Sequence, residues 1–416
     1  MKLGEIIGAD RGDGSKPLDG LRILAIEQMQ ALPFATQLLT HLGAEVVKIE
    51  HPVHGDSGRG SLPAVHDTDG RQAGATFLRN SLSKRSVAID LKHPEGVALN
   101  KRLAPKFDVV AENFKPGTMK RLGLGYEDLA AEDSRLIYLS VSGFGNLSES
   151  PYAPWPAYAP IAEAMAGFYE MRRAPDEYPR LGPAGALGDI GSSLFAAIGL
   201  LAALRHRERT GSGQYVDIAM FDAMVAMADV VPFFHSMGVF QRKNRASGIV
   251  NAFRADDGFF IIQAVRDHQL GLVAKAVGHP EWLEDERFAE RSGYPEHMED
   301  VVKPAIEEWA SGKTMLEACT ELTSQGVAAG PCFSAEHVIN DPHVRDHNMI
   351  IEVPRPDADE PLLVVGNPIK LSKVAEGPVR RWPTLGEHTD EVLGEDLGLD
   401  AAELARLREA GAIGGD

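Results

Sequence analysis

A chain of 416 residues, 44% hydrophobic and 25% charged, has the composition of a folded globular protein, and its length favours two domains. Its net charge of −18 argues against a nucleic-acid partner, which needs a basic surface. Two cysteines without a CxxC pair favour a reducing, cytoplasmic location over a disulfide framework or zinc site. The apolar run 194–204 is shorter than the ~20 residues that span a bilayer, so we expect no membrane association.

Short apolar runs alternate with helical segments over the first half of the chain. Residues 1–17 are polar and glycine-rich, and we expect a flexible arm there. The alternation predicts parallel strands in an open α/β sheet wrapped by helices, with ligands bound where the strands end. Strands are expected at 21–27, 44–50, 86–92, 108–114, 135–145 and 213–220, and helices between them at 33–43, 93–106 and 115–123.

The second half of the chain changes character after a polar segment. A helix is expected over 192–211, followed by an apolar helix that breaks near Pro232. We place a domain boundary at the loop-like sequence QRKNRASG, residues 241–248. From about 253 to 341 the pattern indicates a hairpin and then mostly helices, and a final amphipathic helix closes the chain.

Asp189 is the one carboxylate in the glycine-rich stretch GALGDIGSS, residues 185–193. An Asp here can cap the helix that begins near Ile190, because its side chain accepts the free N–H groups of the first turn. It can equally be a nucleophile that the helix dipole keeps ionised, with Gly188 and Gly191 leaving room for a substrate carbonyl. The local sequence leaves both interpretations open.

Other motifs are incomplete or weak. No GxGxxG fingerprint follows a strand, and no metal-ligand spacing occurs, so we predict neither a nicotinamide cofactor nor a metal. Gln30 lies at the end of the first expected strand, where it either contacts a ligand or bonds a loop. In ENFKPGTMKRLG, Lys120 and Arg121 could bind an anion at a helix start, and Phe114 could stack on a purine. Each also suits a solvated helix or a core.

Seven segments in order along the chain carry a resemblance to a known family. They are GLRILAIEQMQALPFATQLLTHLGAEVVKIEHPVHGDSGRG, FLRNSLSKRSVAIDLKHPEG, DVVAENFKPGTMKRLGLGYEDL, LIYLSVSGFG, PAGALGDIGSS, RTGSGQYVDIAMFDA and GEHTDEVL. They resemble the family III coenzyme A transferases, a group with formyl-CoA transferase, carnitine CoA-transferase and the BaiF proteins. The match runs from about residue 18 to 400.

The resemblance implies a Rossmann-like large domain with a parallel sheet, plus a small inserted α+β domain. The first part of the large domain would cover 18–222, the linker 223–250 and the small domain 251–340. Residues 341–416 would complete the large domain. Two copies of the chain would interlock as a homodimer, each threading the hole in the other.

The resemblance also implies that Asp189 is the covalent nucleophile, with Gln30 beside the reacting carboxylate. Asp189 would attack an acyl-CoA thioester, giving a mixed anhydride and a CoA thiolate, and the thiolate would then form an aspartyl-CoA thioester. A carboxylic acid acceptor would reverse these steps. Capping and catalysis are then compatible, and no tightly bound cofactor is implied because the CoA thioester is the substrate.

Several positions match residues that contact CoA in the family. His51 stands where a basic residue meets the nucleotide phosphates, and it is a departure if arginine is usual there. Met220 matches a residue that lines the active site. The full set is Ala31, His51, Asn113, Phe114, Arg121, Tyr158 and Met220.

The main alternative is an α-methylacyl-CoA racemase, which uses the same Asp in acid–base chemistry. Racemases need a second base, typically a histidine where this chain has Tyr158. A phenol with an ordinary pKa near ~10 accepts protons poorly at neutral pH, which disfavours this function, although His51, His54 or His235 could fold nearby. A CoA-ester hydrolase and a non-catalytic CoA-binding homologue also remain, and the intact nucleophile argues against the latter.

Two departures bear on the substrate. QRKNRASG stands where formyl-CoA and oxalate enzymes carry a run of glycines, and Leu32 replaces the glycine common after the Gln-Ala pair. Both put formate and oxalate in doubt, and we expect a dicarboxylic or branched acid instead.

Overall fold

The computed structural model describes residues 1–147, 149–170, 173, 177–182, 185–228, 231–238 and 247–415. The chain divides into two compact units. One combines Met1–Asp229 with His343–Asp416, and the other is Val230–Pro342. Most of the polar segment that we expected as a linker loop lies outside the described residues.

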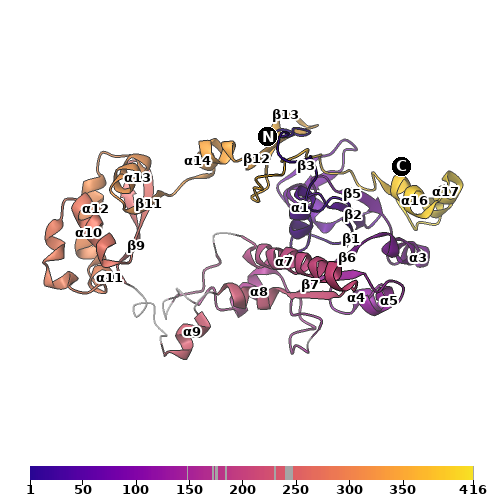
Figure 1. The fold of residues 1–416 in the computed structure, drawn as a ribbon, viewed down its shortest axis with the longest axis horizontal. Helices are drawn as coiled ribbons and strands as arrows, with labels where there is room; N and C mark the ends of the chain where they lie inside the picture. The colour runs from indigo at the N-terminus through magenta and orange to yellow at the C-terminus, as the bar shows by residue number, and fades with distance from the viewer. Residues whose placement is uncertain are drawn as a thin grey trace. The chain divides into compact units, whose positions relative to one another are not determined.

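A six-stranded parallel sheet forms the centre of the larger unit (Figure 1). Its order is β5-β2-β1-β6-β7-β8, which is the 3-2-1-4-5-6 order of a doubly wound sheet with its switch point between β1 and β6. The expected α/β fold is confirmed. The strands are β1 (Arg22–Ile26), β2 (Glu45–Glu50), β5 (Arg85–Ala88), β6 (Val109–Glu112), β7 (Ile137–Ser142) and β8 (Tyr215–Ala219).

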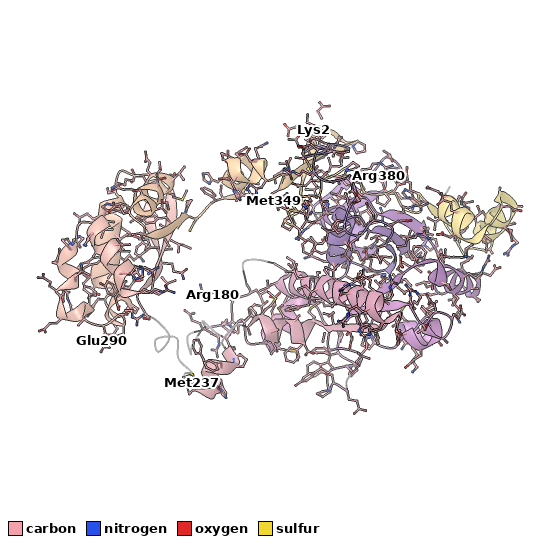
Figure 2. All side chains as sticks on the ribbon, in the orientation of Figure 1. Lys2, Arg180, Met237, Glu290, Met349 and Arg380 are labelled. Carbon is pink, nitrogen blue, oxygen red and sulfur yellow. The ribbon has the colours of Figure 1, made fainter. Side chains whose placement is uncertain are left out.

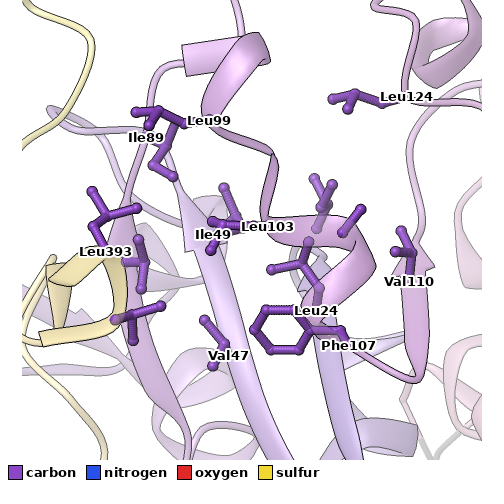
Figure 3. Packing of buried hydrophobic residues seen from close by; sticks show 14 of the residues in the cluster. Leu24, Val47, Ile49, Ile89, Leu99, Leu103, Phe107, Val110, Leu124 and Leu393 are labelled. Atoms are coloured by element: carbon purple, nitrogen blue, oxygen red, sulfur yellow. The ribbon is translucent and has the colours of Figure 1, made fainter. Parts of the chain in front are cut away.

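The strands are mostly apolar on both faces because helices cover both faces. On one face Leu24 and Val47 of the sheet pack with Leu103 of α3 (Pro94–Leu103) and Leu393 of α16 (Thr389–Leu397), as Figure 3 shows. On the other face the sheet packs with α1 (Pro33–His41), α7 (Leu187–Thr210) and α8 (Met220–Met227). Each fully buried Leu, Ile or Val stabilises the fold by about 1.5–3 kcal/mol.

Helix α7 is longer than its apolar run predicted. It has 24 residues, and among the described residues it is the one helix whose length and composition would suit a membrane span. Its face with Ala196, Leu200 and Ala203 is buried against the sheet, so this face of the helix is part of the core. The chain after α8 continues as a separate short helix, α9 (Val231–Ser236), in keeping with the break expected near Pro232.

The N-terminal segment, expected as a flexible arm, makes backbone contacts with the C-terminal part of the chain. The Met1 amino group donates to the Ile350 carbonyl at 2.9 Å, and Lys2 forms a β-bridge with Glu352 (Figure 2, near the labels Lys2 and Met349). The Met1 side chain also packs against an apolar cluster. Shorter elements that build this part of the unit are β3 (Ala64–His66), β4 (Gln72–Gly74), α2 (Ala75–Arg79), β12 (Ile350–Arg355) and β13 (Ala358–Val365).

The smaller unit has a core of its own. The expected hairpin is present as two antiparallel strands, and a third strand pairs beside them. Phe253 and Phe260 of this sheet are buried against helices that carry Trp282, Ile306 and Leu322. Its main elements are β9 (Ile249–Ala255), β10 (Gly258–Ala264), β11 (Ala328–Pro331), α10 (Asp267–Ala276), α12 (Lys303–Ala310) and α13 (Met315–Ser324), while the chain ends with α17 (Ala401–Glu409) in the larger unit.

Candidate active site

The loop between β1 and α1 lies at the switch point of the sheet and is held by side chains from two other strand ends. Asn113, just after β6, accepts from the Gln28 N–H at 2.8 Å and donates to the Gln28 carbonyl at 2.9 Å. The next N–H, of Met29, donates to Asp56 at 2.9 Å, and Met29 has a left-handed φ of 63°. These bonds fix the approach to Gln30, which follows directly in this loop.

A cluster of buried charges lies under the same loop. Lys48 Nζ lies 2.7 Å from Asp56 Oδ2, and Lys84 Nζ lies 2.7 Å from Glu27 Oε1. All four side chains are almost completely buried. Lys84 Nζ also donates to the carbonyl of Pro33 at 3.0 Å, at the first turn of α1. Paired buried charges of this kind hold one geometry, because leaving either partner alone is strongly unfavourable.

Asp189 is the third residue of α7, and it does not cap the helix. The residue before the helix is Ala186, in a left-handed conformation with φ 56°, and no side chain at that position caps the helix. The carboxylate of Glu163, from α6 (Ala159–Met165), instead accepts from the Gly188 N–H at 2.9 Å. A Cβ on Gly188 would meet Ala159 at 2.8 Å, so glycine permits this close approach of α6 to α7. Capping by Asp189 was therefore a wrong prediction.

The electrostatic environment of Asp189 also differs from our expectation. Partial burial, together with the like charge of Glu163, raises the pKa of Asp189 to about 6. The helix dipole alone would lower this pKa, so burial outweighs the dipole, although the carboxylate that we expected to be ionised is still ionised at neutral pH. No hydrogen bond to the Asp189 carboxylate occurs within the described residues. A carboxyl group with this pKa is ionised at neutral pH and remains unbonded, as a nucleophile requires.

Helices α1 and α7 bring Asp189 toward the β1–α1 loop. The Ser193 hydroxyl donates to the carbonyl of Ala31 and lies 2.7 Å from the carbonyl of Asp189, one turn earlier. Since Gln30 precedes Ala31, the two residues predicted for catalysis lie within one residue and one helical turn of this contact between α7 and the start of α1.

The remaining predicted residues follow strand ends, with two exceptions. His51 follows β2, Phe114 follows β6 and Met220 follows β8, so all three lie at the edge where an open sheet binds ligands. Met220 is buried in the same cluster as the α1 loop, whereas Tyr158, before α6, is 70% exposed. Arg121 is exposed at the end of α4 (Thr118–Arg121) and, within the described chain, its side chain bonds only Thr118.

Three residues beside this site were not singled out from the sequence. Glu163 is an isolated carboxylate in the small-residue segment AEAMAG, which was the available signal. Arg79 and Lys84 lie in FLRNSLSKRS, where a motif was recognised but no role was assigned. Most contacts of these three side chains come from segments distant in sequence, so the sequence pattern could not predict them.

Comparison with known proteins agrees with this architecture. A family model described as CoA-transferase family III matches residues 18–389. The chain belongs to CoA-transferase family III. The resemblance noted from the sequence is thereby confirmed, and the protein is a CoA-transferase family enzyme.

Relatives of similar length cover nearly the whole chain. Succinyl-CoA–D-citramalate CoA-transferase of Chloroflexus aurantiacus is 36% identical over 403 residues, which are 94% of this chain and 97% of that protein. The succinyl-CoA–L-malate CoA-transferase beta subunit of the same organism is 33% identical over 409 residues, 95% and 98% of the two chains. The crystal structure of a CAIB/BAIF family protein from Brucella suis has a TM-score of 0.79 and 31% identity, covering 92% of this chain and 100% of that one.

Proposed function

We propose that this family III enzyme moves CoA from an acyl-CoA donor to a carboxylic acid acceptor through a covalent intermediate on Asp189. The observation that carries the proposal is the carboxylate of Asp189, partly buried and without a hydrogen-bond partner in the described chain. A carboxyl group with a perturbed pKa at a ligand-binding sheet edge is a candidate reactive group.

The proposed exchange has two symmetrical halves. Oδ of Asp189 attacks the thioester carbon, the C–S bond breaks, and CoA leaves as the thiolate, so that a mixed anhydride forms. The thiolate attacks the γ-carbonyl carbon of Asp189, the anhydride C–O bond breaks, and the donor acid leaves as its carboxylate. The acceptor carboxylate then attacks the aspartyl thioester, and the same steps in reverse give the new CoA ester and free Asp189.

The neighbouring loop supplies positioning in this proposal. Gln30 orients the acyl group beside Asp189, and the loop is fixed before substrate binds because Asn113 and Asp56 hold its backbone. Both polar atoms of the Asn113 amide bond Gln28, so we expect Asn113 to reach CoA only through its remaining N–H. The CoA thioester is held, as substrate and not as a resident cofactor, by Ala31, His51, Asn113, Phe114, Arg121, Tyr158 and Met220.

For the acids we propose dicarboxylates. Relatives at 33–36% identity are named for transfer between succinyl-CoA and malate or citramalate, which are all dicarboxylic acids. This agrees with the dicarboxylic or branched acid expected from the sequence. We also propose that the enzyme is cytoplasmic.

We further propose that the enzyme works as an interlocked homodimer. Helix α7 exposes Leu194, Ile198 and Leu201, which are 44%, 61% and 39% exposed and recur at helical spacing on one face. An apolar stripe of this kind on a long helix is typical of a surface that another chain covers. Light scattering of the purified protein would give the mass of a dimer, and a monomer would contradict this part.

The covalent step can be tested directly. The purified protein is incubated with succinyl-CoA, quenched with hydroxylamine, and its peptides are mapped by mass spectrometry, with Asp189→Asn as control. A hydroxamate at Asp189 in the unaltered protein, absent from the variant, supports the proposal. No modification, together with deuterium uptake at the α-carbon of a 2-methylacyl-CoA, would instead indicate a racemase.

A further inference from the structure

Arg79, the last residue of α2, is a partly buried cation without a counter-charge. Its guanidinium carbon lies 4.8 Å from the ring centroid of Phe34, and its buried Nε has no hydrogen-bond partner among the described residues. None of the ion pairs in the described chain includes it, and burial alone lowers its pKa. Arg59 shows the usual arrangement, since it also lies over a ring, that of Phe77, yet pairs with Glu50 at 2.7 and 2.8 Å.

Two more unpartnered polar atoms follow Arg79 in the chain. The Asn80 Oδ1 and the Ser81 Oγ are both buried and have no hydrogen-bond partner in the part of the chain that the structure describes. Native proteins leave few buried polar groups unsatisfied, so three in consecutive residues call for an explanation. Lys84 does not belong to this set, because its ammonium group donates to Glu27, to the Pro33 carbonyl and to the Thr36 hydroxyl. The unpartnered polar groups of residues 79–81 therefore include one positively charged group, the guanidinium of Arg79.

Arg79 adjoins the candidate active site through the first turn of α1. Phe34, whose ring lies under the guanidinium, donates its backbone N–H to the carbonyl of Gln30 at 2.9 Å. On the other side of this turn, the Ala31 carbonyl accepts from Ser193, one helical turn beyond Asp189. Arg79 and the helix segment that carries Asp189 thus both contact the first turn of α1, Arg79 at Phe34 and the α7 segment at Ala31.

We propose that Arg79 binds the distal carboxylate of a dicarboxylic acyl group whose other carboxyl carbon is the thioester carbon attacked by Asp189. This inference rests on the proposed function and names its substrate class. A guanidinium matches a carboxylate with two parallel charge-assisted hydrogen bonds, and the Phe34 ring keeps the guanidinium in place. A monocarboxylic acyl group leaves Arg79 unpaired, so the enzyme selects dicarboxylic acids.

The test compares two four-carbon esters that differ in the distal carboxylate. Calorimetry measures binding of succinyl-CoA, butyryl-CoA and free CoA to Asp189→Ala protein, which holds an ester without turnover. Adding Arg79→Met is expected to weaken succinyl-CoA binding roughly 10- to 100-fold, as for a lost charged hydrogen bond, and to leave butyryl-CoA unchanged. With Arg79→Lys, succinyl-CoA should bind more tightly than with Arg79→Met and more weakly than with Arg79. The matched control Arg71→Met removes an exposed arginine before β4 and should change neither ester.

Three results would overturn the inference. Equal weakening of both esters and of free CoA would mean that Arg79 binds a phosphate of CoA. Unchanged binding of succinyl-CoA in the Arg79→Met variant would contradict the distal-carboxylate site. Equal binding of succinyl-CoA and butyryl-CoA by protein that keeps Arg79 would contradict it too. Because binding is measured without turnover, a failure of the covalent proposal would show separately, as absent hydroxamate on otherwise unaltered protein.

Discussion

The carboxylate of Glu163 accepts a hydrogen bond from the Gly188 N–H at 2.9 Å, so a neighbouring helix caps the start of α7. The hydroxyl of Tyr169 also donates to Glu163, which fixes that carboxylate in place. Glu163 accepts the Gly188 N–H of the first turn, and within the described residues no hydrogen bond reaches the carboxylate of Asp189. Of the two interpretations of Asp189 that the sequence left open, capping thus falls to Glu163, and reaction remains the proposal for Asp189.

Replacing Glu163 with glutamine should shift the pH dependence of the enzyme. Glutamine keeps an oxygen that accepts the Gly188 N–H but removes the like charge that helps raise the pKa of Asp189. That pKa should fall below about 6, and the acid limb of kcat/KM should move to lower pH by up to about one unit. Rates between pH 4.5 and 8 would show this, with the exposed Glu170→Gln as control. An unmoved acid limb would contradict the electrostatic role of Glu163.

Asp189→Asn should abolish transfer and stabilise the fold at the same time. Burial raises the pKa of Asp189 above its unfolded value, so the folded state holds the proton more tightly and ionisation lowers stability as pH rises from about 4 to 6. The variant escapes this penalty, and its free energy of unfolding should be about 1 kcal/mol higher at pH 8. Near pH 4 the gain should vanish. Urea unfolding at both pH values measures it, and a loss of stability at pH 8 would refute the assignment.

Much of the fold could be predicted because its pattern is local. Runs such as RILAI and EVVKIE are short and apolar, and the helices between them follow helical spacing, so parallel pairing follows from the connections. The strand order depends on packing between distant segments and could not be predicted from this pattern. The start of α7 was also misplaced, because the turn is set by Ala186 in a left-handed conformation that alanine seldom adopts.

The candidate site was only partly predictable for the same reason. Asp189 and Gln30 were identified by motif, yet the pKa of Asp189 depends on its burial and then on Glu163, which lies 26 residues earlier in the chain. Lys48 lies in an expected buried strand, and its partners, Glu27 and Asp56, come from other loops. A sequence pattern shows that a charge is present, but only the fold shows what neutralises it.

Asn113→Ala should loosen the β1–α1 loop. The substitution removes both hydrogen bonds with the Gln28 backbone, at 2.8 and 2.9 Å, and should lower the free energy of unfolding by about 1–3 kcal/mol. Because the loop carries Gln30, kcat should fall as well as stability. Asn113→Asp keeps only the acceptor for the Gln28 N–H, so its stability and kcat should lie between those of the alanine variant and the unaltered protein. Chemical denaturation and steady-state kinetics would check this, and an unchanged kcat in the alanine variant would argue against positioning by Asn113.

Lys84→Met should be among the most destabilising single changes near the site. It removes the ammonium group bonded to Glu27 and to the Pro33 carbonyl, and it leaves a buried carboxylate with less compensation. Breaking one side of such a pair lowers stability by about 3–5 kcal/mol. The double variant with Glu27→Gln removes both charges, so its loss should be smaller than the sum of the two single losses. A double-mutant cycle from urea unfolding measures the coupling. Simple additivity would mean that the Lys84–Glu27 pair does not act as a unit, and that α1 is held by other contacts.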